Sequence, residues 1–253
     1  MKIGCCAPIE KAQAVSDAGF DYLECTVVSL DPEGGEAAFE EILQQFLTSP
    51  VPVEAFNVFL PGDLAVVGPS VDWQRVKAYL KSALRRVSKI GADVVVFGSG
   101  KARSIPEGFA RDKAEEQLRK FLHLAADEAE ANNVTIVIEP LNKKESNIIN
   151  SVAEAVDFVK AVNRPPIQAL ADFYHIDEDN EPLTNIRDCR ENVFHIHVAD
   201  TGRKAPGTGS YPYDEFSAYV KQTRSPRVSI ECGWTDFEAE APAALAFLRK
   251  KFA

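Results

Sequence analysis

The sequence predicts an α/β fold, a single (β/α)8 barrel of the TIM type that takes up all of residues 1–253. Short apolar and β-branched runs alternate eight times with longer amphipathic stretches, and no linker separates the repeats. Single barrels commonly have about 200–250 residues, so the length fits one domain. Right-handed crossovers between parallel strands place the helices outside a closed sheet.

The expected strands are short runs in which β-branched, aromatic and other apolar residues predominate. In chain order they are Lys2–Cys6, Tyr22–Thr26, Val53–Asn57, Asp93–Phe97, Thr135–Glu139, Ile167–Asp172, Val193–Val198 and Arg227–Glu231. The expected helices are the amphipathic stretches between them. In chain order they are Glu10–Ala18, Glu36–Leu47, Val71–Ile90, Glu107–Asn132, Val152–Val162, Pro182–Cys189, Tyr213–Thr223 and Phe237–Lys251. Gly19 and Gly91 directly follow two of these helices, where a glycine commonly ends a helix.

An open, doubly wound sheet is the alternative arrangement of the same alternating units. Such a sheet commonly binds a dinucleotide through a GxGxxG turn after its first strand. The corresponding segment here reads Gly4-Cys5-Cys6-Ala7-Pro8. Because the glycine pattern is missing, the closed barrel is favoured.

Composition and charge restrict the partners. The chain has 28 basic and 38 acidic side chains and a formal net charge of −10, which disfavours nucleic acid and anionic membranes as partners. Its apolar runs are short, and its 45% hydrophobic residues are typical of a soluble globular protein. The five cysteines include no CxxC pair, and the first thirty residues show no secretion signal. We therefore expect a cytoplasmic protein with a small-molecule partner, either a monomer or a homo-oligomer.

Polar residues mark the C-terminal ends of the last four expected strands, where barrel enzymes build their sites. These strands contain Val137-Ile138-Glu139, Leu170-Ala171-Asp172, His195-Ile196-His197 and Ser229-Ile230-Glu231. Because side chains alternate along a strand, the middle residue of each triplet should face the helices. Glu139, Asp172, His197 and Glu231 should then converge at the mouth of the barrel.

Three carboxylates and one imidazole at one place would repel one another and lose solvation unless a positive charge lay among them. A divalent metal ion would supply that charge. Oxygen-rich ligation with one nitrogen suits Mn²⁺, Mg²⁺ or Co²⁺, with Zn²⁺ as a further candidate. Helix capping or pairing with Lys or Arg explains any single acidic strand end equally well. For all four residues together, a shared metal site is the better interpretation.

Motifs between Glu139 and Glu231 follow one another in a distinctive order. They are Glu139-Pro140-Leu141-Asn142, Glu145, Asn147, Ala171-Asp172-Phe173-Tyr174-His175, His195-Ile196-His197, Arg203 and Ile230-Glu231. This order resembles that of the xylose isomerase-like sugar isomerases and epimerases, and within them the ketose 3-epimerases of the D-tagatose 3-epimerase type. The resemblance implies a metal ion held by Glu139, Asp172, His197 and Glu231. It also implies a sugar contacted by Glu145, His175 and Arg203.

The resemblance implies a sugar or sugar-phosphate isomerase or epimerase. A divalent metal ion acidifies the C–H next to a chelated carbonyl because it stabilises the enediolate that forms. A carboxylate can then act as the base. Glu139 and Glu231 are the expected acid/base pair, one removing the proton and the other delivering it.

Three alternative functions stay open. A lyase or dehydratase acting on a keto-sugar or inosose would begin with the same proton abstraction and then lose a β-hydroxyl. A sugar-binding barrel without activity would not need an intact pair of glutamates. A nuclease of the endonuclease IV type would need several metal ions and many histidines, whereas the chain has four.

Neighbouring residues also have more than one interpretation. Asp200 could be the carboxylate that orients His197, or an ordinary loop acid. His195 is either a second ligand or, as we favour, a hydrogen-bonded interior residue. The segment Gly98–Arg103 contains two glycines and two bases and could cradle a phosphate. It lacks the spacing of a P-loop, so we favour a loop that leaves room near the substrate.

Overall fold

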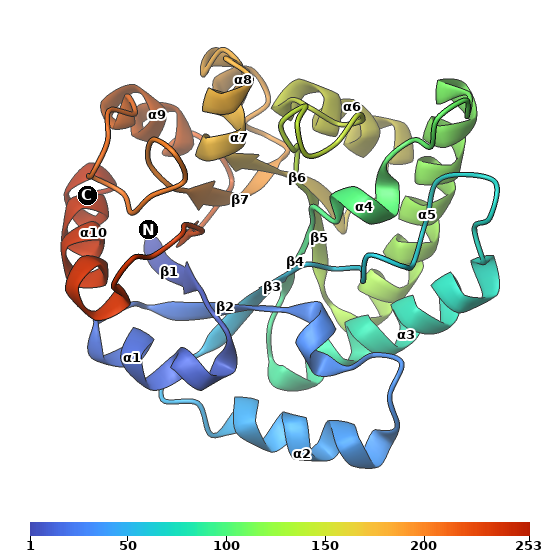
Figure 1. The fold of residues 1–253 in the computed structure, drawn as a ribbon, viewed down its shortest axis with the longest axis horizontal. Coiled ribbons are helices and arrows are strands. Elements are labelled where there is room, and N and C mark those ends of the chain that lie inside the picture. The colour runs from blue at the N-terminus through green and yellow to red at the C-terminus, as the bar shows by residue number, and fades with distance from the viewer.

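The computed structural model describes residues 1–253 and has the predicted closed barrel. Eight parallel strands pair in sequence order, and the last strand pairs with the first to close the sheet. Helices surround this sheet (Figure 1). No helix has both the length and the apolar composition that crossing a membrane requires.

The strands lie close to their predicted positions. They are β1 (Lys2–Cys6), β2 (Tyr22–Thr26), β3 (Val53–Asn57), β4 (Val94–Phe97), β5 (Thr135–Ile138), β6 (Ile167–Asp172), β7 (Val193–Val198) and β8 (Arg227–Ile230). β1, β2, β3, β6 and β7 have the predicted bounds, and the other three differ by one residue at one end. The alternation of inward and outward side chains therefore holds as predicted.

The helices vary more at their ends. They are α1 (Ala12–Asp17), α2 (Glu36–Leu47), α3 (Trp73–Ile90), α4 (Gly100–Arg103), α5 (Arg111–Asn132), α6 (Val152–Val162), α7 (Phe173–Glu178), α8 (Thr184–Asp188), α9 (Tyr213–Val220) and α10 (Phe237–Lys251). The helix predicted from Val71 begins at Trp73, because the Asp72 carboxylate caps it by accepting from the Gln74 and Arg75 N–H groups. The short helices α4 and α7, which lie after β4 and β6, are not among the helices predicted from the sequence. Gly19 and Gly91 end their helices with φ of +88° and +97°, as predicted.

Two apolar regions hold the barrel together. The larger one fills the space between the strands and the helices. The smaller one lies inside the sheet and consists of Tyr22, Ala55, Val94, Val96, Val137 and Leu170. Along β5 and β6, the inward positions that follow these apolar residues are Glu139 and Asp172, so the interior becomes polar toward the C-terminal ends of the strands.

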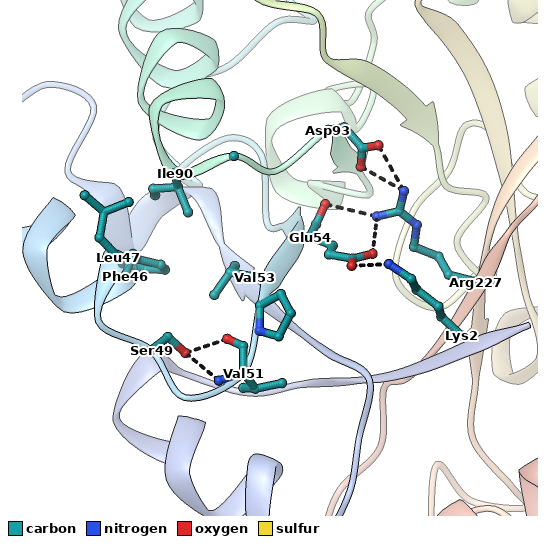
Figure 2. A pocket seen from close by; sticks show the side chains of 12 residues that line it. Lys2, Phe46, Leu47, Ser49, Val51, Val53, Glu54, Ile90, Asp93 and Arg227 are labelled. Carbon is teal, nitrogen blue, oxygen red and sulfur yellow. Dashed lines mark hydrogen bonds and ion pairs between the residues drawn. The ribbon is translucent and has the colours of Figure 1, made fainter.

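The N-terminal end of the barrel carries an ion-pair network beside a cavity of about 460 Å³ (Figure 2). Arg227 lies 3.2 Å from Glu54 and 2.9 Å from Asp93, and Lys2 also pairs with Glu54. These four residues stand at or next to the first residues of β1, β3, β4 and β8. They join the strands at the end opposite to the predicted site, where barrel residues generally serve stability.

Candidate metal centre

The structure brings together the four residues that the strand ends indicated. One ligand-type atom from each of Glu139, Asp172, His197 and Glu231 lies within 4.8 Å of the others. Glu139 and Glu231 each follow the last residue of their strand, but their backbone N–H groups still bond to Phe97 and Val198 of the neighbouring strands. The strand geometry thus continues one residue further and keeps both side chains pointing inward.

His197 lies at the centre of the cluster and is fully buried. Its Nδ1 is 3.2 Å from Glu139 Oε1, 3.7 Å from Glu231 Oε2 and 3.9 Å from Asp172 Oδ2. Burial alone would lower the pKa of His197, but the carboxylates of Glu24, Glu231 and Glu139 raise that pKa well above its usual value. The acidic groups around His197 thus favour a positive charge at this place.

The carboxylates respond to one another in opposite ways. Burial, with the nearby charges of Glu139 and Asp172, raises the pKa of Glu231 to about 6. Burial would also raise the pKa of Glu139, but the hydrogen bond and charge of His197, together with the charges of His175 and Arg103, outweigh it and lower that pKa. The cluster thus stabilises the charged form of Glu139 and destabilises the charged form of Glu231.

A divalent cation suits this donor set. Asp172 uses Oδ1 to cap α7, accepting from the Tyr174 N–H at 2.7 Å, while its buried Oδ2 has no hydrogen-bond partner. A buried carboxylate oxygen without a partner is costly unless something else satisfies it. The three carboxylates of the cluster, which include this oxygen, and the one imidazole nitrogen are the ligand types of Mn²⁺, Mg²⁺ and related ions.

The three predicted sugar contacts lie beside the cluster. Arg203 donates to Glu231 at 2.6 Å and is 3.7 Å from Glu145. His175 accepts at Nδ1 from the backbone and side-chain amides of Asn142, which leaves its Nε2 3.8 Å from Asp172 Oδ2. Asn142 also donates to Glu145 at 3.0 Å. The loops after β5 and β7 and helix α7 after β6 therefore meet at one edge of the cluster.

The segment Gly98–Arg103 has a steric and structural role near Glu139. A Cβ at Gly98 would lie 2.0 Å from Glu139 Oε2, so this position needs a residue without a side chain. Arg103 is fully buried and donates to the backbone carbonyls of Phe97 and Glu139 at 2.8 and 2.6 Å. Its guanidinium therefore points into the protein, which is inconsistent with a phosphate cradle and agrees with the favoured interpretation.

Asp200 does not orient His197. Its carboxylate accepts from the backbone N–H groups of Thr201, Gly207 and Tyr211, and so it organises the loop after β7. The carboxylate that contacts His197 at Nε2 is Glu24 of β2, at 2.8 Å. His195 also donates to Glu24, as an interior hydrogen-bonded residue outside the cluster. Glu24 is not among the residues predicted from the sequence, although strand alternation from the inward-facing Tyr22 places it inside the barrel.

Comparison with known proteins agrees with the fold. A family model described as the xylose isomerase-like TIM barrel matches residues 12–251. A D-psicose 3-epimerase from Agrobacterium fabrum is 28% identical over 150 residues, which are 57% of this chain and 51% of that protein. A 3-dehydro-D-guloside 4-epimerase from Escherichia coli is 29% identical over 149 residues, 55% of this chain and 53% of that protein. The chain thus spans about half the length of these relatives.

A solved structure shows the same architecture over the full chain. The crystal structure of a D-psicose 3-epimerase in the presence of D-fructose superimposes with a TM-score of 0.87 and 20% sequence identity. The match covers 100% of this chain and 99% of that one. At this level of identity the likeness concerns the fold.

Proposed function

The chain belongs to the xylose isomerase-like TIM barrel family, and from this premise we propose that it is a divalent-metal-dependent sugar epimerase that transfers a proton at a carbon next to a ketose carbonyl. The observation that supports the proposal most is the buried cluster of Glu139, Asp172, His197 and Glu231 at the C-terminal end of the barrel. The epimerases that resemble the chain in sequence support the same reaction class.

These four residues would hold the metal ion through one oxygen of each carboxylate and Nδ1 of His197. When bound, the ion supplies a Lewis acid that acidifies the C–H bond next to the carbonyl. Glu139 and Glu231 would be the proton-transfer pair, one removing the proton and the other returning it on the opposite face. They come from β5 and β8, so the substrate carbon can lie between them.

Arg203, His175 and Glu145 would bind the sugar hydroxyl groups. His175 has Nδ1 occupied by Asn142, so Nε2 is the nitrogen that can donate to a substrate oxygen. Arg203 is engaged with Glu231 and Glu145, and Arg103 is engaged with backbone carbonyls. Because these guanidinium groups already have partners, we propose a ketose without a phosphate group as the substrate class.

Hydrogen exchange in D₂O tests the proposal without a prior choice of product. The metal-loaded protein is incubated with free ketohexoses, their phosphates, aldoses and 3-keto sugars, and deuterium is located by NMR and mass spectrometry after the protein is removed. Deuterium at C3 of a free ketose with the C3 epimer as product is the expected result. Label at C1 or C2 with an aldose–ketose conversion would identify an isomerase instead, and loss of water would identify a dehydratase.

Glu139→Gln and Glu231→Gln are the matched variants, because each keeps an oxygen and the side-chain shape. Both should abolish exchange while the fold, followed by circular dichroism, is retained. Near-normal exchange in either variant would contradict the two-glutamate mechanism. No exchange with any sugar, from protein that binds Mn²⁺, would contradict the proposed activity.

A further inference from the structure

Glu24 is a fully enclosed carboxylate that the proposed chemistry does not use. It stands on β2, contacts His197 at the ring nitrogen that does not face the carboxylates of the cluster, and is 1% exposed. Its Oε1 accepts from Nε2 of His197 at 2.8 Å, and its Oε2 accepts from Nε2 of His195 at 2.8 Å. Both oxygens are thus committed to imidazole N–H groups on β7.

Two further hydrogen bonds, made by Ser229 and Tyr22, hold the Glu24 carboxylate in place. Ser229 donates to Glu24 Oε2 at 2.5 Å, and the hydroxyl of Tyr22 lies 2.7 Å from Ser229 Oγ. Because Ser229 has one proton and gives it to Glu24, the Tyr22 hydroxyl is the donor to Ser229. Gly4 makes this possible, since a Cβ there would lie 2.3 Å from the Tyr22 ring. The position of Glu24 is therefore determined by residues of β1, β2, β7 and β8.

These contacts determine which nitrogen of His197 faces the cluster. A neutral imidazole carries one N–H and one lone pair, and the hydrogen bond at one nitrogen decides where the proton stays. Glu24 holds the proton on Nε2, so Nδ1 is the nitrogen that can give up its proton to a metal ion, and it lies 3.2 Å from Glu139 and 3.7 Å from Glu231. In His195, by contrast, Nδ1 is buried without a hydrogen-bond partner, and the residue is not one of the clustered ligand-type side chains.

We propose that Glu24 is a positioning residue, which fixes the tautomer and the ring orientation of His197 so that Nδ1 can bind a divalent metal ion. His195 and Ser229 hold the Glu24 carboxylate in place. The inference rests on the proposed function, because it assumes that the cluster binds a metal ion. A carboxylate that holds a metal-binding imidazole in this way commonly changes metal affinity about 10- to 100-fold.

Metal affinity of the folded protein is the first test. Glu24→Gln and a control, Glu181→Gln, are titrated with Mn²⁺ by calorimetry, with no sugar present. Glu181 is a partly buried carboxylate that accepts from Val152 N–H and Asn185, and it belongs to none of the clustered groups. We expect affinity to fall about 10- to 100-fold in Glu24→Gln and to stay at the wild-type value in Glu181→Gln. A folded Glu24→Gln protein with wild-type Mn²⁺ affinity would overturn the proposal.

The imidazole tautomer of the wild-type protein is the second test, and it decides the question if Glu24→Gln does not fold. Histidine ring ¹⁵N shifts are recorded on the protein loaded with Zn²⁺, which is diamagnetic. We expect a proton on Nε2 of His197 and none on Nδ1. A proton on Nδ1 would overturn the proposal. Neither measurement uses a sugar, so a failure of the epimerase proposal in the exchange experiment is distinguishable from a failure of this one.

Discussion

Arg203 and Glu231, which are 28 residues apart in the sequence, form an ion pair with 2.6 Å between Nη2 and Oε2. The Arg203 backbone has a φ of +59°, and its carbonyl accepts from the Gly233 N–H at 2.8 Å, so the loops after β7 and β8 are tied together at this residue. The guanidinium also lies 4.9 Å from the centre of the Tyr174 ring. Arg203 thus connects one proposed proton-transfer residue with the rim of the site.

The first prediction concerns Arg203→Lys. Lysine keeps the charge but loses the planar fork that reaches Glu231 and Glu145 together. A charged hydrogen bond contributes about 1.5–3 kcal/mol, so we expect kcat/KM for the active ketose to fall about 10- to 100-fold while Mn²⁺ affinity is retained. Arg187→Lys is the control, because Arg187 also lies over a tyrosine ring but pairs with Asp188 on the surface. Unchanged kcat/KM in Arg203→Lys would show that Arg203 does not contact the substrate.

The second prediction concerns Gly98→Ala. The added Cβ would lie 2.0 Å from Glu139 Oε2, so the Glu139 carboxylate has to leave its position in the cluster. Overpacking of this kind costs about 1–3 kcal/mol. Because the cost falls on a proposed metal ligand, we expect Mn²⁺ binding to become about 10- to 100-fold weaker. Gly35→Ala is a suitable control, because a Cβ there meets no atom within 4 Å. Equal Mn²⁺ affinities of the two variants would contradict the steric role of Gly98.

Much of the site can be predicted from the sequence, because the direction of a side chain on a strand depends only on its position along that strand. Glu139, Asp172, His197 and Glu231 each end or nearly end a strand, and alternation alone indicates that they face inward. In a closed parallel barrel, the C-terminal ends of all strands meet at one mouth, so local direction and fold class together predict the convergence.

The contacts that support the site are not local, and for this reason sequence reasoning missed them. Glu24 meets His197 across the barrel at a separation of 173 residues. No periodicity specifies which interior side chains meet across a sheet that closes on itself. Arg103 follows a strand beside two glycines, a pattern that also suits phosphate binding, and only its direction in the structure decides between the two interpretations. The role of Asp200 was similarly undetermined, because a loop acid can orient a side chain or organise its own loop.

The third prediction concerns Asp200→Asn. Asp200 accepts from three backbone N–H groups of the loop that carries Arg203, and an amide can accept through one atom only. Loss of these bonds should lower the free energy of unfolding by about 1–3 kcal/mol, and proteolysis should begin within residues 201–211. The substitution should also lower kcat/KM, because the loop then holds Arg203 less firmly, while the Mn²⁺ affinity is retained.

Asp236→Asn is the control for this experiment, because Asp236 caps α10 through one N–H group on the surface. Urea unfolding and limited proteolysis with mass spectrometry measure the two stability effects. If Asp200→Asn were cleaved as slowly as Asp236→Asn and kept the wild-type kcat/KM, the loop would not depend on the Asp200 carboxylate.

The last prediction concerns Asp21 and the pH dependence of stability. Asp21 joins the two ends of the chain, because it accepts from the Ile3 N–H at 2.7 Å and from Arg249 of α10 at 3.0 Å. Burial alone would raise the pKa of Asp21, but the hydrogen bonds from Arg249 and Ile3 outweigh it and hold that pKa below its usual value. A carboxyl group whose pKa is lower in the folded state stabilises the fold above its unfolded pKa, and this contribution disappears as the pH falls through the folded pKa.

Asp21→Asn should therefore lower the free energy of unfolding at pH 7 by up to about 1 kcal/mol, the usual upper value for an exposed ion pair. The difference from wild type should shrink toward zero as the pH falls below the usual pKa of an aspartate and through the lower folded pKa of Asp21, because Asp21 itself becomes neutral there. Urea unfolding at several pH values measures this difference. Asp188→Asn is the control, since Asp188 pairs with Arg187 on the surface without a backbone N–H partner, and we expect a smaller change at pH 7. A destabilisation by Asp21→Asn that stayed constant with pH would mean that side-chain shape, and not the Asp21 charge, joins the two ends of the chain.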